Sequence, residues 1–277
     1  MDAPVPAVPD IPARKAGETI IRFEGVQKGF GSGAARKVVY EGIDLDVRKG
    51  EVLTIMGGSG TGKSVLLKLL VGLLKVDSGR ILVDGIDVAT FNEEELLPVR
   101  RQIGMVFQGA ALFDSLTVYE NVAYPLREHN EWPEEKIRDA VAEKLSLVGL
   151  PGVEKMKPAD LSGGMRKRVG LARALATGAD VILYDEPTTG LDPTNTRRIN
   201  ELIKAVNRKL GVTSIVVTHD MGSAFDISHR LAMLYEKKIT WTGTTDEARK
   251  QTSGIVKQFI EGRVPDGEMY DGESDGS

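Results

Sequence analysis

One stretch of glycine, hydroxyl and lysine residues has the composition and spacing needed to bind phosphate groups. Residues 57–64 read GGSGTGKS and follow directly on the apolar run VLTIM at 52–56. Glycines let the backbone curl so that its N–H groups converge on phosphate oxygens, and a following helix adds its positive N-terminal end. In this pattern Lys63 contacts the β- and γ-phosphates and the Ser64 hydroxyl binds Mg²⁺. The sequence therefore predicts a nucleotide-binding loop between a strand and a helix.

Two adjacent carboxylates follow a second apolar run, VILY at 181–184. A buried strand delivers the residues at its carboxyl end to the edge of the sheet where α/β proteins bind ligands. Asp185 is suited to hold Mg²⁺, usually through water, and Glu186 to polarise an attacking water molecule as general base. Alone, two acids after a strand are more often a solvated turn. The phosphate-binding loop in the same chain favours a hydrolytic site.

A third motif, LSGGMRKR at 161–168, lies between the other two. Ser162 is a good helix N-cap, and the two glycines after it leave the start of the helix accessible to an anion. A second anion site has no use next to the first loop within the same subunit. The alternative is an ordinary capped surface helix.

The elements that position these motifs alternate between strands and helices. Strands are predicted at Ile20–Glu24, Val52–Met56, Met105–Phe107, Val181–Tyr184 and Ser214–Thr218, and helices at Ser64–Leu74, Glu134–Val148, Met165–Ala176 and Thr194–Leu210. Several of the strands are apolar throughout, as expected of parallel strands covered on both faces. This alternation predicts an α/β domain with a mostly parallel sheet.

Composition and charge narrow the class of protein. The 277 residues carry a net charge of −4, which gives no reason to expect nucleic acid as a partner. They contain no cysteine, which excludes disulfides. No run approaches the ~20 apolar residues that span a bilayer, and no signal peptide is evident, so we expect a cytoplasmic chain.

The chain divides into three predicted parts. Residues 1–18 are a Pro-rich tail expected to be disordered, 19–249 form one domain with a helical subdomain inserted at about 109–160, and 250–277 form a C-terminal extension. In this extension a helix is expected to continue past Arg249 to Ile260 before an acidic tail.

The third motif resembles the signature of ABC ATPases, LSGGQ followed by a basic helical stretch, and with it residues 20–243 resemble an ABC ATPase. The resemblance implies a P-loop NTPase (RecA-like) α/β core with an antiparallel β subdomain and an inserted helical subdomain. It implies hydrolysis of ATP with Mg²⁺ between two head-to-tail copies, each signature facing the γ-phosphate held by the other copy. Met165 departs from the usual glutamine and removes one amide that could contact the nucleotide.

The resemblance extends to single positions. Phe30 matches the aromatic that stacks on adenine, although a Phe at a strand end is often only core. Gln108 matches the glutamine that touches Mg²⁺ or water and relays movement to the membrane subunit. Asp192 belongs to a segment that matches the loop that contacts the opposite subunit. His219 matches the histidine that hydrogen-bonds the γ-phosphate. The expected catalytic residues are Lys63, Gln108, Glu186 and His219, and the expected metal ligands are Ser64, Gln108 and Asp185. The expected nucleotide contacts are Phe30, Gly57, Gly58, Ser59, Gly60, Thr61, Gly62, Lys63, Ser64, Val65, Ser162, Gly163, Gly164 and Asp192.

Three longer strings, MGGSGTGKSVLLK, FQGAALFDSLTVYENVAYPL and LSGGMRKRVGLARA, are similar to the ATPases of Mla/Mce-type lipid transporters. This implies phospholipid cargo, an integral membrane permease (MlaE-like), an MCE-domain lipid-binding protein (MlaD-like) and, in some relatives, a STAS-domain subunit. The chain would then lie on the cytoplasmic side of the inner membrane. Residues 256–262 resemble an extension that in relatives crosses to the other ATPase subunit.

Other classes explain fewer of the motifs. An ABC transporter for a polar solute differs only in cargo and stays open. ABC-type translation factors carry two cassettes and DNA-repair ATPases a long coiled coil, whereas this chain has one cassette and room only for a helical subdomain between Lys63 and Ser162. A P-loop kinase or GTPase would not explain the signature or His219.

Overall fold

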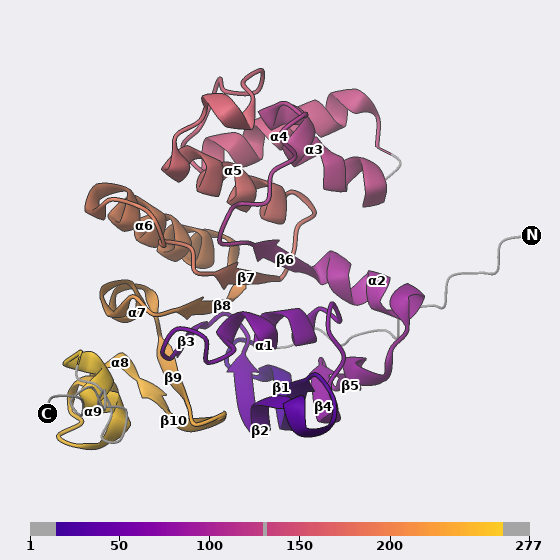
Figure 1. Ribbon diagram of the computed structural model, residues 1–277. Coiled ribbons are helices and arrows are strands. Elements are labelled where there is room, and N and C mark those ends of the chain that lie inside the picture. Colours follow the sequence, from indigo (N-terminus) through magenta and orange to yellow (C-terminus); the bar gives the residue numbers. More distant parts are fainter. Residues whose placement is uncertain (1–14, 130–131, 263–277) are drawn as a thin grey trace, which may run out of the picture.

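The computed structural model describes residues 15–129 and 132–262, which form two β-sheets with helices between and around them (Figure 1). The predicted N-terminal tail lies outside the described residues except for its last four, and the acidic tail from residue 263 lies outside them entirely. Within the described ranges, no helix combines the length and the apolar character that crossing a membrane requires.

The larger sheet has six strands in the order β10-β9-β3-β8-β7-β6. Its strands are β3 (Val52–Met56), β6 (Ile103–Val106), β7 (Val181–Asp185), β8 (Thr213–Thr218), β9 (Arg230–Tyr235) and β10 (Lys238–Thr244). All neighbours pair in parallel except β10, which is antiparallel to β9. Strands β3, β7 and β8 are buried along their whole length, which explains why they are apolar without alternation. The carboxyl ends of five strands therefore share one edge.

The smaller sheet is antiparallel, with the order β2-β1-β4-β5. Its strands are β1 (Thr19–Phe30), β2 (Lys37–Arg48), β4 (Ser78–Val83) and β5 (Ile86–Asp87). Helix α1 (Lys63–Leu70) joins the two sheets, because Leu66 and Leu70 share a core with Phe23 of β1 and Ile55 of β3. The predicted antiparallel β subdomain is confirmed.

A helical layer covers the other end of the larger sheet (Figure 1). It consists of α3 (Val118–His129), α4 (Glu134–Leu147) and α5 (Gly163–Ala176), which lie between β6 and β7 in the chain. Helix α2 (Glu93–Gln102) precedes β6, and its Leu96 packs instead into the core that contains α1 and the smaller sheet. Leu126 of α3, Val141 of α4 and Val169 of α5 meet in one core. The described residues between β6 and β7 contain no strand, as the sequence predicts, while the subdomain boundaries at about 109 and 160 stay a prediction.

The C-terminal helices differ from their predicted form. Helices α6 (Pro193–Leu210) and α7 (Met221–Ile227) flank β8, and α8 (Thr245–Arg249) follows β10. The helix expected to continue past Arg249 ends there, and a separate helix α9 (Gly254–Ile260) begins after a break. Val256 of α9 packs into a cluster with Met56, Met233 and Ala248, so the described part of the extension rests on its own chain.

Two further boundaries in the predicted elements are corrected. The helix expected to reach Leu74 ends at Leu70, because Gly72 has a φ of +68° and the Leu73 N–H turns back to the carbonyl of Lys68. The strand predicted at Met105–Phe107 is β6, which begins two residues earlier and ends at Val106.

A buried asparagine, Asn121, anchors the segment that enters the helical layer. Its side-chain oxygen accepts from the Phe113 N–H at 2.8 Å. Its amide nitrogen donates to the carbonyls of Phe113, Leu116 and Thr117 at 3.1, 3.3 and 3.0 Å. This one side chain therefore ties together three positions of the segment, and it is the partner of the Phe113 N–H and of the Leu116 carbonyl.

We expect Asn121→Ala to lower the free energy of unfolding by about 2–3 kcal/mol, because the buried side chain is lost and the Phe113 N–H and the Leu116 carbonyl lose their partner. Asn92 is the matched control: it is exposed and caps α2 through Glu95, so Asn92→Ala should cost only about 1 kcal/mol. Urea unfolding followed by circular dichroism measures both. Equal losses in the two variants would show that Asn121 contributes no more to stability than an exposed helix cap.

Candidate active site

The phosphate-binding motif forms the predicted loop between β3 and α1. Gly57 has no room for a side chain, because a Cβ there would lie 2.6 Å from the carbonyl oxygen of Leu234. Gly62 has a φ of +101°, and a Cβ on it would lie 2.5 Å from Val39. The Tyr40 hydroxyl donates to the Gly62 carbonyl at 2.5 Å from strand β2. The smaller sheet thus braces the back of the loop.

The ammonium group of Lys63 lies inside the phosphate-binding loop. Its Nζ donates to the carbonyls of Gly57 and Gly58 at 2.9 and 2.8 Å, and it lies 3.7 Å from Oε1 of Glu186. Burial lowers the pKa of Lys63, and the charges of Glu186 and Asp185 oppose that shift. The loop therefore holds a buried cation where phosphate oxygens are expected to bind.

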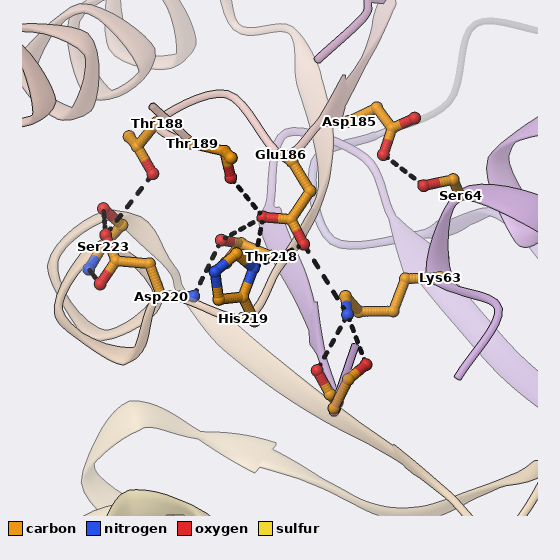
Figure 2. Close-up of polar contacts among 12 residues, drawn as sticks. Lys63, Ser64, Asp185, Glu186, Thr188, Thr189, Thr218, His219, Asp220 and Ser223 are labelled. Carbon is orange, nitrogen blue, oxygen red and sulfur yellow. Dashed lines mark hydrogen bonds and ion pairs between the residues drawn. The ribbon is translucent and has the colours of Figure 1, made fainter. Parts of the chain in front are cut away.

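Ser64 and Asp185 come from different elements and meet directly. Ser64 Oγ in α1 donates to Oδ1 of Asp185, the last residue of β7, at 2.6 Å (Figure 2). The pairing of β7 with β8 and of β8 with β3 brings these two positions to the same sheet edge. A hydroxyl and a carboxylate oxygen are hard donors of the kind that Mg²⁺ prefers.

Glu186 is the centre of the polar cluster in Figure 2. Its carboxylate accepts from the hydroxyls of Thr189 and Thr218 at 3.0 and 3.2 Å, and its Oε1 lies 3.0 Å from Nδ1 of His219. Burial would raise the pKa of Glu186, but the hydrogen bonds of His219 and Thr189 and the charges of His219 and Lys63 bring it below its usual value. The group is therefore a carboxylate at neutral pH.

The backbone of Glu186 is strained. Its φ of +49° lies in the left-handed region, which costs a non-glycine residue about 1–3 kcal/mol. The Glu186 N–H donates to the Val217 carbonyl of β8 at 2.9 Å, and Pro187 follows directly. This conformation aims the side chain along the sheet edge toward Lys63 and His219.

The signature and Asp192 form a second group. Ser162 caps α5 by accepting from the Met165 N–H at 3.3 Å, which confirms its predicted N-cap role. Asp192 caps α6 through the Thr194 and Asn195 N–H groups. A Cβ on Gly164 would lie 2.9 Å from Asn195 Oδ1, so the two helix starts pack closely. Ser162 and Asp192 are exposed, and their side-chain hydrogen bonds stay within this second group.

Within the described residues, Phe30 and Gln108 share no hydrogen bond or ion pair with either group. Phe30, at the end of β1, is 41% exposed, with Lys28 Nζ 5.3 Å from its ring centre, so the alternative of a core residue is wrong. Asp77 holds this strand end, since it accepts from Lys28 and from the Gly29 N–H. Gln108 is exposed on the turn that follows β6.

Sequence reasoning missed three residues that shape the site. Thr218 and Thr189 hold the Glu186 carboxylate, and Tyr40 braces the loop. Thr218 is next to His219 in the sequence, and Thr189 lies three residues after Glu186. Their closeness to predicted site residues is a signal that could have identified both. Tyr40 belongs to a strand that was not predicted and carries no local signal.

The chain is similar to known ATP-binding proteins of transporters. Residues 40–189 match the family model described as ABC transporter. A probable ribonucleotide transport ATP-binding protein (mkl) of Mycobacterium leprae is 44% identical over 243 residues, 88% of this chain and 69% of that protein. The intermembrane phospholipid transport system ATP-binding protein MlaF of Haemophilus influenzae is 42% identical over 226 residues, 82% of this chain and 86% of that protein. The methionine import ATP-binding protein MetN 2 of Rhodococcus jostii is 45% identical over 242 residues, covering 87% and 71%.

A solved structure shares the architecture. The ATP-binding cassette MJ0796, in a dimeric post-hydrolysis state bound to ADP and phosphate, has a TM-score of 0.75 and 33% sequence identity, over 81% of this chain and 98% of that chain. The predicted fold class is confirmed. Together the family model, the relatives and the fold show that this chain belongs to the ABC transporter family, as a subunit that binds and hydrolyses ATP.

Proposed function

We propose that two copies of this chain bind Mg–ATP between them, head to tail, and that Glu186 is the general base of hydrolysis. The observation that carries the proposal is the meeting of Lys63, Asp185, Glu186 and His219 at one sheet edge (Figure 2). Lys63 supplies a cation that can bind phosphate, Asp185 supplies oxygen atoms that can bind a metal ion, and Glu186 supplies a carboxylate that can accept a proton from water. This is the set that phosphoryl transfer to water requires.

The phosphate loop binds the nucleotide through its backbone and Lys63. The Lys63 ammonium donates to two loop carbonyls. Phosphate oxygens carry charge and are stronger acceptors, so Lys63 turns from those carbonyls to the β- and γ-phosphates. Residues 57–65 surround the phosphates, and Phe30 stacks on adenine from its exposed strand end.

Ser64, Asp185 and Gln108 are the residues that would hold Mg²⁺. The Ser64 hydroxyl and the Asp185 carboxylate are already adjacent. Among the described residues no three His, Asp or Glu side chains form a metal cage, which suits an ion that keeps phosphate and water ligands. When bound, Mg²⁺ neutralises charge on the phosphate oxygens.

Glu186 and His219 act on the attacking water and the γ-phosphate. When Lys63 turns to phosphate, Oε1 of Glu186 loses its cationic neighbour and can accept a proton from water. His219 has a half-exposed side chain beside Glu186, so its ring can hydrogen-bond a γ-phosphate that arrives from solvent. Ser162, Gly163, Gly164 and Asp192 of the other copy complete the pocket, which is consistent with the dimeric state of the MJ0796 cassette.

A groove supports contact with a membrane permease. It has a volume of about 380 Å³ and lies between β6 and α3, close to Gln108. Phe113 and Tyr124 line it with their rings 5.2 Å apart, and both are close to half exposed. Exposed aromatic side chains of this kind mark interaction sites. Movement at Gln108 after hydrolysis would then be transmitted to a permease segment seated in this groove.

The cargo is a phospholipid or related lipid, with an MlaE-like permease and an MCE-domain protein as partners, and with a STAS-domain subunit in some systems. The similarity to MlaF of Haemophilus influenzae supports this assignment. The chain would then work on the cytoplasmic side of the inner membrane. A polar solute is the alternative, since mkl and MetN 2 have similar identity and their names state ribonucleotide transport and methionine import.

Purification of the tagged chain from membranes, followed by mass spectrometry of proteins and lipids, tests the cargo. We expect a multi-span permease, an MCE-domain protein and bound phospholipid. A permease that co-purifies with an amino-acid- or nucleotide-binding protein would assign the chain to polar solutes.

Glu186→Gln should lower ATP turnover by about 10²–10⁴-fold, because the amide cannot take a proton from water. It should also retain ATP and trap a closed dimer, seen as a shift in size-exclusion chromatography with Mg–ATP. Glu51→Gln is the control, since Glu51 lies at the other end of β3, paired with Arg230. Turnover at the wild-type rate in Glu186→Gln removes Glu186 from the base role.

Lys63→Ala should weaken ATP binding about 10–100-fold and reduce turnover as well, because a charge-assisted hydrogen bond to phosphate is lost in every nucleotide state. Titration with a fluorescent ATP analogue measures the affinity. Lys68→Ala, later on the same helix, should bind normally. ATP affinity that is unchanged in Lys63→Ala contradicts the assigned contact.

A further inference from the structure

Lys167 is a buried cation that the proposed mechanism does not use. It lies in the second turn of α5, the helix that begins at the signature, and only 7% of its surface is exposed. Within the part of the chain that the structure describes, its Nζ has a single hydrogen bond, to the main-chain oxygen of Glu186 at 3.2 Å. A surface lysine would leave its ammonium in water, so this contact needs an explanation.

A buried lysine at this position costs free energy of folding, because its ammonium group is removed from water, unless the ammonium makes a contact that offsets this cost. Burial lowers the pKa of Lys167, and the charge of Glu186 opposes the shift. An apolar side chain of similar length would fill the same space without removing a charge from water. The feature that an apolar side chain could not supply is a donor for the Glu186 carbonyl.

That carbonyl belongs to the strained residue of the site. Glu186 has a φ of +49° and precedes proline, which favours extended conformations in the residue before it. Its N–H is held by Val217 of β8 at 2.9 Å, and its carbonyl accepts from Lys167 and from the Thr189 N–H at 3.3 Å. Strand β8 thus fixes the peptide group before Glu186, and α5 helps to fix the group after it.

We propose that Lys167 is a positioning residue for ATP hydrolysis, which holds the main chain of Glu186 in its left-handed conformation from the signature helix. The inference rests on the proposed role of Glu186 as base and deepens it. Helix α5 then carries two functions along its first turns. Ser162 to Gly164 at its start face the nucleotide of the other copy, and Lys167 sets the glutamate that acts on the nucleotide of its own copy.

The test compares two substitutions in the purified full chain with Mg–ATP. Lys167→Met keeps an unbranched chain as far as Cε and removes the donor. We expect kcat to fall about 10–100-fold with little change in KM, because a misplaced catalytic group lowers the rate of the chemical step. Lys167→Gln retains a donor and should recover most of the lost rate. Arg168→Met is the control: Arg168 is on the same helix and also donates to main-chain carbonyls, at Val148 and Gly149, but not to Glu186.

A double-mutant cycle with Glu186→Gln separates positioning from mere structural support. If Lys167 acts through Glu186, the double variant should turn over no more slowly than Glu186→Gln alone. Multiplied losses would overturn the proposal, and so would wild-type kcat in Lys167→Met or a Lys167→Gln variant as slow as Lys167→Met. Thermal unfolding by circular dichroism shows whether Lys167→Met is folded, and Lys167→Gln carries the test if it is not. Wild-type turnover in Glu186→Gln would instead refute the proposed function itself.

Discussion

The Lys63 ammonium is buried between two loop carbonyls and the Glu186 carboxylate, and the rest of the site is arranged around that charge. A buried cation is stable only with acceptors on several sides. The glycine loop supplies some of these acceptors, and β7 and its following turn supply the other. Phosphate oxygens are acceptors of the same kind, so the position of Lys63 suits the binding of phosphate.

The parallel sheet makes this arrangement possible because its central strands end at one edge. Strands β3, β8 and β7 are adjacent in space, although they are far apart in sequence. Their carboxyl ends lead to the phosphate loop, to His219 and to Asp185 with Glu186. The smaller sheet contributes from behind through Tyr40, and α5 contributes through Lys167. The smaller sheet and the signature helix therefore each contact this edge of the sheet through one side chain.

Much of the site was predictable because its chemistry is local in sequence. The phosphate loop, the acids after β7 and the capped signature helix each depend on a few consecutive residues, and β3 was predicted with its exact bounds. Strand β2 was missed because Gly42 interrupts its alternation of apolar and polar residues. Strand β4 was missed because its first three residues are exposed and not apolar, and β5 because it has only two residues. The contacts of Tyr40, Thr218 and Lys167 join residues far apart in the chain, and no local sequence pattern predicts such contacts.

We propose that each nucleotide is held by two copies of this chain, since the side-chain hydrogen bonds of Ser162 and Asp192 join neither residue to Lys63 of the same copy. A crystal structure of the full chain with Mg²⁺ and a non-hydrolysable ATP analogue tests it most directly. The account predicts two analogues at a symmetric interface, each with its γ-phosphate between Lys63 of one copy and Ser162 of the other. A γ-phosphate enclosed by a single copy, with Ser162 of a second copy contacting no nucleotide, would contradict it.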